Sequence, residues 1–562
     1  MSAAWFFPGD IMDTIEDLFR RFEQLNAIGA ALSHERDINR LLESILAAAM
    51  TITHADGGTL YRMAEDGAHL TFEILHTASL GLSLGGTSGK RVPYAPLPLR
   101  TESGEPNNSM VAAYAAIHDE TVNIADAYVA EGFDFSGTRH FDARNGYRSK
   151  SFLTVPMKNH ENDIIGVLQL INAMDPGSGA VVSFSAADQR LAESLASQAA
   201  IALTNRQLIT QLETLFESFI ELINVAIDEK SPYTGGHCER VPVLTMMLAE
   251  AVNETTEGPL ADFTMTERDR YELKIAGLLH DCGKVTTPVH VVDKGTKLEA
   301  IFDRIDLLDT RFEVVRRDVE IEALKAKLAL RAPRDASAEA ALDWQMGQRL
   351  QQVEEDRAFL HAANVGVEAM ATEDQERVRR IATEYTWRPH GRDEIAFLSE
   401  DEVENLTVRS GTLTAKERDI INHHIVATIK MLEALPWPKH LRNVPEYAGG
   451  HHERMDGKGY PRGLTREQMS VQARVMGIAD IFEALTAKDR PYKRGKTLSE
   501  TLHILGKFKL NGHIDPDLFD VFVRAKVYRK YAEMFLDAEQ IDEVDEGGIP
   551  GFASAVDNCK SN

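Results

Sequence analysis

The sequence predicts a multidomain protein with an α+β domain built on an antiparallel sheet, a long connecting helix, and an all-α domain interrupted by an inserted helical arm. Three observations predict this order. Short alternating apolar segments and glycine-containing turns fill the first two hundred residues. An unbroken helical pattern then runs from Asp188 to about Glu229, and the chain beyond it is strongly helical to about Asp537. A chain of 562 residues also exceeds the roughly 250–300 residues at which single cores stop growing.

The composition is that of a folded protein with an acidic surface. Hydrophobic residues make up 43% and charged residues 26% of the chain, and the net charge is −26. Such a surface repels polyanions, so we expect no DNA or RNA partner, whereas a small phosphorylated ligand in a local pocket remains compatible. The three cysteines, Cys238, Cys282 and Cys559, lack the spacing of a disulfide framework or a zinc site. With no signal peptide or membrane span in the sequence, we expect a cytoplasmic protein.

The α+β domain is predicted from four candidate strands and two helices. A leading helix is expected from about Asp37 to Ile52, a turn over Gly81–Gly89, and a closing helix after Phe184. The strands are expected at 58–63, 70–76, 151–158 and 163–172. The last two strands and the F-x-x-x-D start of the closing helix make this segment resemble a GAF domain.

Some GAF domains that bind cyclic nucleotides carry a motif of Asn, Lys, Phe, Asp and Glu. Asn172, Phe184 and Asp188 match it, but Ala173 and Gln189 stand nearest to the Lys and Glu positions. Two interpretations stay open: the domain senses a small-molecule ligand, or these residues only pin the last strand to its helix and the domain is a dimerisation platform.

The connecting helix carries an apolar seam that predicts a homodimer. Its members recur at spacings of four and three, as in a parallel coiled coil: Leu208, Leu212, Phe216, Phe219, Ile223 and Ala226. The alternative is an amphipathic helix that packs on its own domain.

The expected domain boundaries follow from these patterns. The charge-rich helical block at 297–392 is interpreted as a solvated arm without catalytic groups. The segments are an N-terminal helical extension (1–30), the GAF-like domain (31–205), the connecting helix (206–229), the helical domain (230–537) and a flexible tail (538–562).

Five clusters of histidines and carboxylates in the helical domain carry the candidate chemistry. A lone histidine is more often structural than catalytic, but five clusters flanked by apolar helix favour a common centre. These residue types bind borderline divalent metals. The clusters are His237-Cys238-Glu239, His280-Asp281-Cys282-Gly283-Lys284, His423-His424, His451-His452-Glu453 and Asp480-Ile481-Phe482-Glu483.

Residues 230–295 and 410–500 resemble the HD-GYP family of metal-dependent phosphodiesterases. The family signature H-H-E-x-x-D-G-x-G-Y-P is intact at His451–Pro461, and the stretch Asp489-Arg490-Pro491-Tyr492-Lys493 also matches. The resemblance implies that the metal ligands are His237, His280, Asp281, His424, His451, His452 and Asp480.

Seven nitrogen and oxygen ligands imply two divalent metal ions, bridged by Asp281, with iron or manganese preferred to zinc. His424 is chosen over His423 because Leu432 follows it at the family spacing, although Thr428 replaces the usual Gly. Tyr233 stands where some members place a third-metal Glu, so a dinuclear site is favoured.

The activity implied is hydrolysis of cyclic di-GMP to pGpG or GMP. Asp281 and Lys284 are the candidate catalytic residues, with Lys284 contacting phosphate or protonating the leaving group. The candidate substrate-binding residues are Arg490, Lys493, Lys294 and Tyr460. The loop at Tyr460 could instead dock a diguanylate cyclase domain. Alternatives are another cyclic dinucleotide, such as cyclic GMP-AMP, and a catalytically silent receptor or scaffold.

Overall fold

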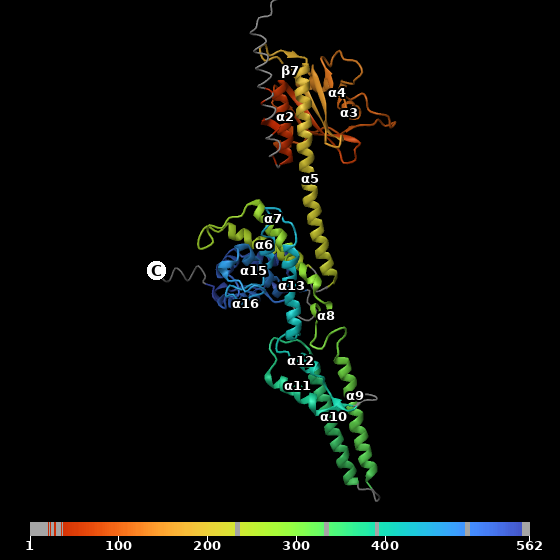
Figure 1. Ribbon diagram of the computed structural model, residues 1–562, viewed down its shortest axis with the longest axis vertical. Coiled ribbons are helices and arrows are strands. Elements are labelled where there is room, and N and C mark those ends of the chain that lie inside the picture. The colour runs from red at the N-terminus through yellow and green to blue at the C-terminus, as the bar shows by residue number, and fades with distance from the viewer. Residues whose placement is uncertain are drawn as a thin grey trace, which may run out of the picture. The chain divides into compact units, whose positions relative to one another are not determined.

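The computed structural model describes residues 37–230, 236–330, 336–387, 393–488 and 495–552, with a few residues between 21 and 35. It divides into two compact units, Met1–Phe216 and Glu217–Asn562 (Figure 1). Most of the expected N-terminal extension, 1–30, lies outside the described residues. None of the helices in the described ranges is both long and apolar enough to cross a membrane.

The first unit is built on an antiparallel sheet with the strand order β3-β2-β1-β7-β6-β5, in which β4 also pairs with β2 and β8 with β7. The four predicted strands are all present. The strands are β1 (Ala55–Met63), β2 (His69–Thr77), β3 (Leu82–Gly85), β4 (Leu97–Pro98), β5 (Val122–Ile124), β6 (Phe152–Lys158), β7 (Ile164–Met174) and β8 (Val181–Val182). The predicted turn at Gly81–Gly89 is wrong in part, because Leu82–Gly85 pairs with β2 as an edge strand.

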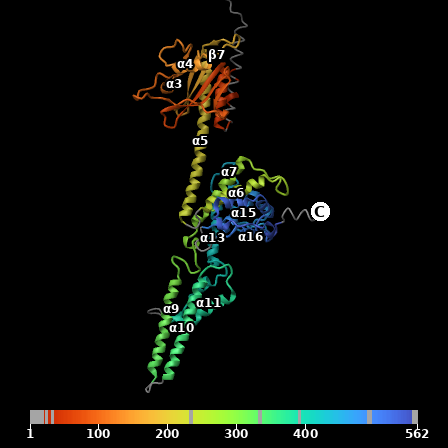
Figure 2. The same ribbon diagram turned by 180° about the vertical axis from the view of Figure 1, so that it is seen from behind.

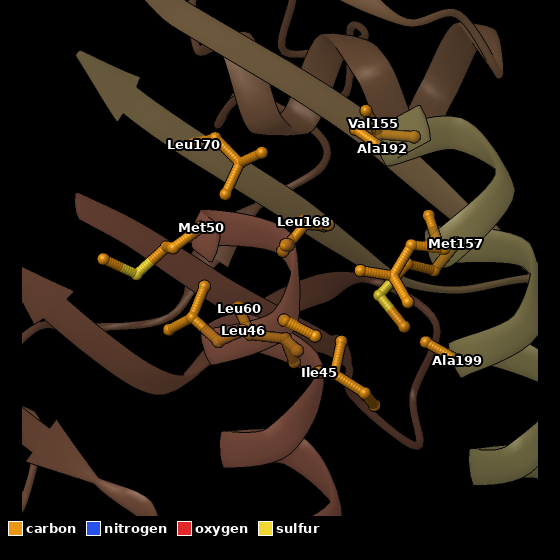
Figure 3. Packing of buried hydrophobic residues seen from close by; sticks show 14 of the residues in the cluster. Ile45, Leu46, Met50, Leu60, Val155, Met157, Leu168, Leu170, Ala192 and Ala199 are labelled. Atoms are coloured by element: carbon orange, nitrogen blue, oxygen red, sulfur yellow. The ribbon is translucent and has the colours of Figure 1, made fainter. Parts of the chain in front are cut away.

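Helices α2 (Ile38–Thr53) and α5 (Ala186–Lys230) cover one face of this sheet. The predicted leading helix begins where expected, because the Asp37 side chain accepts hydrogen bonds from two backbone amides of its first turn. Apolar side chains of α2, α5 and the central strands interlock in the buried cluster of Figure 3, where Leu46, Leu168 and Ala199 are less than 2% exposed. Short helices α3 (Val111–His118) and α4 (Ser136–Asn145) complete the unit.

Helix α5 is a single helix of 45 residues that continues from the first unit into the second. An apolar stripe along it is 44–64% exposed and consists of Leu208, Leu212, Leu215, Phe219 and Leu222. These residues alternate in steps of four and three, which is the spacing of a coiled-coil seam. The stripe shares Leu208, Leu212 and Phe219 with the predicted seam, but it includes Leu215 in place of the half-buried Phe216, and Leu222 beside the exposed Ile223.

The second unit contains a bundle of helices around the predicted His and Asp clusters. Helices α6, α7, α14 and α15 pack in sequence against one another, and α13 packs on α14 and η2. The elements are α6 (His237–Asn253), α7 (Glu267–Leu279), η2 (Cys282–Thr286), α8 (Val289–Val292), α13 (Ala415–Glu433), α14 (Val444–Gly449), η3 (Arg466–Gln468), α15 (Val471–Thr486), α16 (Leu498–Leu510), α17 (Pro516–Arg524) and α18 (Val527–Phe535).

The inserted arm is present, but it is not merely a solvated hairpin. Helices α9 (Ile305–Ala329) and α10 (Ala336–Asn364) lie side by side (Figures 1 and 2). Their base shares a separate buried cluster with α11 (Thr372–Glu384) and α12 (Glu400–Leu406), close to a short hairpin of β9 (Thr386–Trp387) and β10 (Ile395–Ala396). Phe312, Leu360 and Phe397 are at most 2% exposed in this cluster, so the arm has a core of its own. That core extends to Leu406, beyond the predicted boundary at residue 392.

The expected flexible tail is wrong for residues 538–552. Two short helices, η4 (Ala538–Gln540) and η5 (Glu546–Gly548), form there. Gln540 is buried and donates hydrogen bonds to the carbonyls of Thr486 and Lys496, while Ile549 and Phe552 are also buried. These contacts fix the segment to the helical bundle, although its acidic sequence predicted a flexible tail. Residues 553–562 lie outside the described range.

Candidate metal centre

His280 and Asp281 lie at the end of α7, whose apolar side chains anchor them. Leu273, Ile275 and Leu279 are at most 3% exposed, and the helix ends where His280 begins the cluster. The turn that follows packs tightly on α13. A Cβ on Gly283 would lie 2.0 Å from the carbonyl oxygen of His424, so only glycine allows this approach.

Thr428 explains the departure from the family's usual glycine in α13. Its hydroxyl accepts a hydrogen bond from the backbone amide of Gly283 at 2.9 Å, and the side chain is fully buried. The substitution therefore ties the His-Asp turn to the helix that carries His424, while His423 on the same helix is exposed.

The structure brings all seven predicted metal ligands to one place. His237 is the first residue of α6, His424 lies within α13, His451 and His452 follow α14, and Asp480 lies within α15. Two groups of ligand atoms each lie within 4.8 Å of one another: His237, His280 and Asp281 form the first, and His424, His451 and His452 the second.

The carboxylate of Asp281 faces both groups, one oxygen towards each. Its Oδ2 lies 3.1 Å from Nε2 of His237 and 3.2 Å from Nε2 of His280. Its Oδ1 lies 3.2 Å from Nε2 of His424. Oδ1 of Asp480 lies 3.3 Å from Nε2 of His237 and adds a carboxylate to the first group. A carboxylate with its two oxygens turned to two sets of imidazoles is suited to bridging two cations.

Backbone contacts orient three of the histidines. Nδ1 of His280, His424 and His451 each donates to the carbonyl oxygen three residues earlier, at 2.6–2.7 Å. This tautomer leaves the Nε2 lone pair of each ring free to bind a metal. Nε2 of His451 is buried and has no hydrogen-bond partner among the described residues. A buried lone pair without a partner is costly in a closed site, so the donor set fits divalent cations.

The electrostatics keep four of the candidate ligands in the protonation states that metals require, whereas hydrogen bonds to Asp281, Asp480 and Glu483 outweigh burial and raise the pKa of His237 well above its ordinary value. Burial, with neighbouring histidines, lowers the pKa of His451 well below its ordinary value and that of His452 to about 4, so both are neutral near pH 7. Burial alone would raise the pKa values of Asp281 and Asp480. The opposing effects of Lys284 and His280 on Asp281, and of His237 on Asp480, lower both pKa values below the ordinary range.

Sequence reasoning missed the role of Glu483. This carboxylate is 1% exposed, lies 2.5 Å from Nδ1 of His237, and accepts a hydrogen bond from Nε of Arg240 at 2.7 Å. His237 is therefore oriented by a charged side chain, whereas His280, His424 and His451 are oriented by carbonyls. The signal was available, because Glu483 lies three residues after Asp480 and faces the same side of α15.

Lys284 and Tyr460 lie at the cluster as the sequence suggested. Nζ of Lys284 is 2.6 Å from Oδ2 of Asp281, and this contact raises the pKa of Lys284 although burial alone would lower it. The ring of Tyr460 stacks on His452 with centroids 4.9 Å apart. Glu453 folds the loop around Tyr460, because its buried carboxylate accepts the backbone amides of Arg462 and Leu464 at 2.7 and 2.9 Å.

Lys294 is a correction to the predicted substrate site. Its ammonium group bonds to Glu417 at 2.7 Å and to Asn405 at 2.6 Å, and the side chain is 1% exposed. A buried and neutralised ammonium cannot reach a substrate phosphate, so Lys294 has a structural role at the base of the arm. Arg490 and Lys493, with Tyr233, lie outside the described residues.

The first unit contains a separate cavity of about 390 Å³. Its wall is rich in aromatic side chains, and its lining includes no lysine, arginine or histidine among the described residues. Several polar groups in the wall are satisfied by the protein: Tyr61 bonds to Gln169 at 3.2 Å and Tyr147 to Asp56 at 2.6 Å. Such a cavity suits an uncharged aromatic or apolar molecule better than a cyclic nucleotide phosphate.

The three GAF motif residues hold the fold together. Oδ1 of Asn172 accepts the backbone amide of Lys150 at 2.7 Å, and Asp188 accepts that of Ser185 at 2.9 Å at the start of α5. Phe184 is buried in the main cluster of the unit. None of the three lines the described cavity. This supports the interpretation in which they pin the last strand to its helix.

Comparison with known families matches these two units. Residues 37–203 match the GAF domain, and residues 234–344 and 400–518 match two HD domain profiles. In solved structures, the GAF domain of an Acinetobacter phosphoenolpyruvate-protein phosphotransferase aligns with 34% of this chain and 98% of its own, at 16% identity and a TM-score of 0.25.

Several curated relatives match parts of this chain. The cyclic di-GMP phosphodiesterase PA4108 of Pseudomonas aeruginosa is 38% identical over 21% of this chain and 27% of its own length. The 3'3'-cGAMP-specific phosphodiesterase 1 of Vibrio cholerae is 46% identical over 14% and 19%. A probable cyclic di-GMP phosphodiesterase of Vibrio cholerae is 27% identical over 44% and 55%. The chain thus spans about a fifth to just over half the length of these relatives.

The matches to two HD domain models, together with the ligand cluster, define the second unit as an HD-type domain that follows a GAF domain. The intact signature at His451–Pro461 narrows the class. This chain is an HD-GYP-type protein with an N-terminal GAF domain.

Proposed function

We propose that this protein hydrolyses the phosphodiester bonds of cyclic di-GMP in a metal-dependent reaction, giving pGpG or GMP, under the control of its GAF domain. The single observation that carries the proposal is the placement of Asp281, whose two oxygens face two separate sets of histidines. The names of the relatives from Pseudomonas aeruginosa and Vibrio cholerae support the substrate class.

Two divalent cations would be held by the two groups of ligands. His237, His280 and Asp480 would bind the first ion, His424, His451 and His452 the second, and Asp281 both. When bound, such ions supply a water molecule activated for attack on phosphorus and positive charge for the phosphate oxygens. Imidazole and carboxylate ligands without thiolates suit iron or manganese, which we propose in preference to zinc.

The substrate would reach the cluster from one side, where some of its side chains are partly exposed. His280, Asp281, His424 and His451 are at most 3% exposed and form the floor of the cluster. The side chains of Lys284, His237 and Asp480 are 13–22% exposed and mark its open side. An ammonium at this opening is placed to contact a phosphate oxygen or to give a proton to the leaving oxygen. We retain Arg490 and Lys493 as proposed phosphate ligands because of their match to the family pattern.

A second candidate substrate is 3'3'-cyclic GMP-AMP. The relative of Vibrio cholerae named for that substrate is 46% identical over 81 residues. The metal and phosphate groups bind features that both dinucleotides share, so they do not discriminate between the bases. Tyr460 has one ring face on His452, which limits it to one remaining face for stacking on a base.

The other proposed partners follow from the remaining surfaces. A second copy of the chain would cover the exposed seam of α5 and form a parallel homodimer. The aromatic cavity would bind the small-molecule regulator of the GAF domain. The loop at Gly457–Pro461 stays a proposed docking site for a diguanylate cyclase domain. We also propose that the reaction takes place in the cytoplasm, where such a substrate would be made and consumed.

The test is anaerobic hydrolysis of cyclic di-GMP and 3'3'-cyclic GMP-AMP, side by side, by protein loaded with ferrous or manganous ion. The control is the His280→Ala/Asp281→Ala double variant. We expect metal-dependent turnover of cyclic di-GMP that the double variant loses. Faster turnover of cyclic GMP-AMP would reassign the substrate, and no turnover with both ions bound would favour the receptor or scaffold alternative.

A further inference from the structure

The last turns of α5 have two different faces. Ile220, Asn224 and Ile227 are 2–5% exposed, whereas Leu215 and Phe219 on the seam are more than half exposed. The buried residues recur at steps of four and three, so they form a continuous stripe. This part of α5 belongs to the second unit, where Glu217 also bonds to Lys274 of α7. The end of the helix is therefore fixed to the second unit, while its seam stays available to a second copy.

Asp228 on this helix contacts the segment that carries the first metal ligand. Its Oδ2 accepts a hydrogen bond from the backbone amide of Gly236 at 3.3 Å. Gly236 immediately precedes His237 and has a φ of +77°, which favours glycine. A Cβ there would lie 2.6 Å from Nη1 of Arg240, the residue that holds Glu483 against His237. Asp228 thus contacts the base of the network that orients His237.

Lys230, two residues later, contacts the segment that carries the bridging ligand. Its Nζ donates hydrogen bonds to the carbonyl oxygens of Lys284, at 3.3 Å, and of Val285. These carbonyls belong to η2, the turn that directly follows Asp281. The side chain of Lys284 itself bonds to Asp281 at 2.6 Å. The last turn of α5 thus contacts the backbone next to His237 and the backbone that follows Asp281.

We propose that Asp228 and Lys230 are positioning residues that couple the rotation of α5 to the geometry of the metal centre. This inference rests on the proposed function and names the route of its regulation. Helix α5 begins inside the GAF domain and stays helical for 45 residues, roughly 68 Å at 1.5 Å per residue. A rotation imposed at its start would therefore reach Asp228 and Lys230 and shift His237 relative to Asp281.

The helical repeat provides a direct test. Two residues inserted between Gln211 and Leu212 rotate the end of α5 by about 200°, whereas seven residues rotate it by about 700°, which nearly restores the original face. The seven-residue insertion duplicates Leu212–Ser218 and the two-residue insertion is Ala-Ala. Both are made in the full-length protein, alone and combined with Asp228→Asn/Lys230→Met.

Two readouts are measured: the affinity of the cluster for manganese, with the coupling between the two ions from electron paramagnetic resonance, and the rate of cyclic di-GMP hydrolysis. We expect the two-residue insertion to change both at least fivefold and the seven-residue insertion to stay within twofold of wild type. In the Asp228→Asn/Lys230→Met background the two insertions should give equal values. Lys230→Arg, which keeps a donor, should preserve the dependence on helical phase.

Equal values for both insertions in the otherwise wild-type protein would overturn the coupling, as would a phase dependence that persists without Asp228 and Lys230. Failure of the proposed function has a different signature. Phase-dependent manganese binding without hydrolysis of cyclic di-GMP would remove the substrate assignment and leave the coupling standing. Thermal unfolding of each variant identifies any that does not fold. If the double variant does not fold, the single variants Asp228→Asn and Lys230→Met carry the comparison.

Discussion

Nδ1 of His237 lies 2.5 Å from the carboxylate of Glu483, which Arg240 holds from its other side. The network joins the start of α6 to the interior of α15, two helices separated by more than two hundred residues of sequence. A carboxylate on the outer nitrogen of a metal-binding imidazole fixes the ring and strengthens its donor nitrogen.

We expect Glu483→Gln to lower the affinity for manganese or ferrous ion by about 10–100-fold, because glutamine keeps the shape of the side chain but loses its charge. Calorimetric titration of the metal-free protein measures this. Glu467→Gln, at an exposed position, is the matched control and should leave the affinity unchanged. Equal affinities in both variants would show that Glu483 does not act through His237.

The position of Asp281 predicts different metal contents for two variants. Asp281→Asn removes the carboxylate that faces both histidine groups, so we expect the affinity for both ions to fall. His451→Ala removes a ligand from the second group alone and should spare the ion at His237 and His280. Elemental analysis after dialysis counts the ions. Loss of a single ion from Asp281→Asn would argue against a bridge.

The α5 seam predicts the oligomeric state. Leu212→Lys/Leu215→Lys places charges at two neighbouring seam positions, and we expect the proposed dimer to dissociate. Thr210→Lys is the control, because Thr210 is exposed on the side of the helix away from the seam. Sedimentation velocity measures the mass. A double variant that sediments like wild type would remove the seam as the interface.

Lys297 predicts a pH dependence of stability in the arm. The side chain is fully buried and bonds to the carbonyl of Leu406, and burial lowers its pKa from 10.5 to about 8. Between these two pH values the unfolded state binds more protons than the folded state, so stability rises as the pH is raised through this range. At pH 7 the folded arm bears the full cost of a buried ammonium.

We therefore expect Lys297→Met to stabilise the protein at pH 7, by on the order of 1–2 kcal/mol after the lost hydrogen bond is subtracted. The advantage over wild type should shrink as the pH rises towards 10. Differential scanning calorimetry at several pH values measures it, with the exposed Lys325→Met as control. An advantage that stays constant with pH would contradict a lowered pKa.

Sequence patterns located many of the local elements because those elements depend on short-range rules. The helix from Asp188 to Glu229 lacks proline and glycine, and its counterpart α5 spans Ala186–Lys230. The strands at 151–158 and 163–172 alternate or run apolar as β6 and β7 require. The seam of α5 was harder, because Leu215 and Phe216 are both apolar and only burial shows which one faces outward.

Where sequence reasoning failed, the deciding contact joined distant residues. Lysine is a residue type that often binds phosphate, which made Lys294 a candidate. In the fold, however, the carboxylate of Glu417, 123 positions later, neutralises the charge of Lys294. The acidic residues after Asp537 resemble a disordered tail, yet Gln540 bonds to backbone groups on either side of residue 490. Neither partner can be read from the local pattern.

The sequence by itself determined the residue types of the candidate metal cluster, because borderline divalent cations bind imidazole and carboxylate donors, and five short motifs, the signature at His451–Pro461 among them, supply these donors. Only the tertiary structure decided how those donors divide into two groups of ligands. The direction of each Asp281 oxygen, the support of His237 by Glu483, and the contacts of Asp228 and Lys230 with the two metal-bearing segments arise from helix packing. Packing brings together side chains that local sequence rules leave unrelated, since hydrogen bonds depend on distance in space and not along the chain.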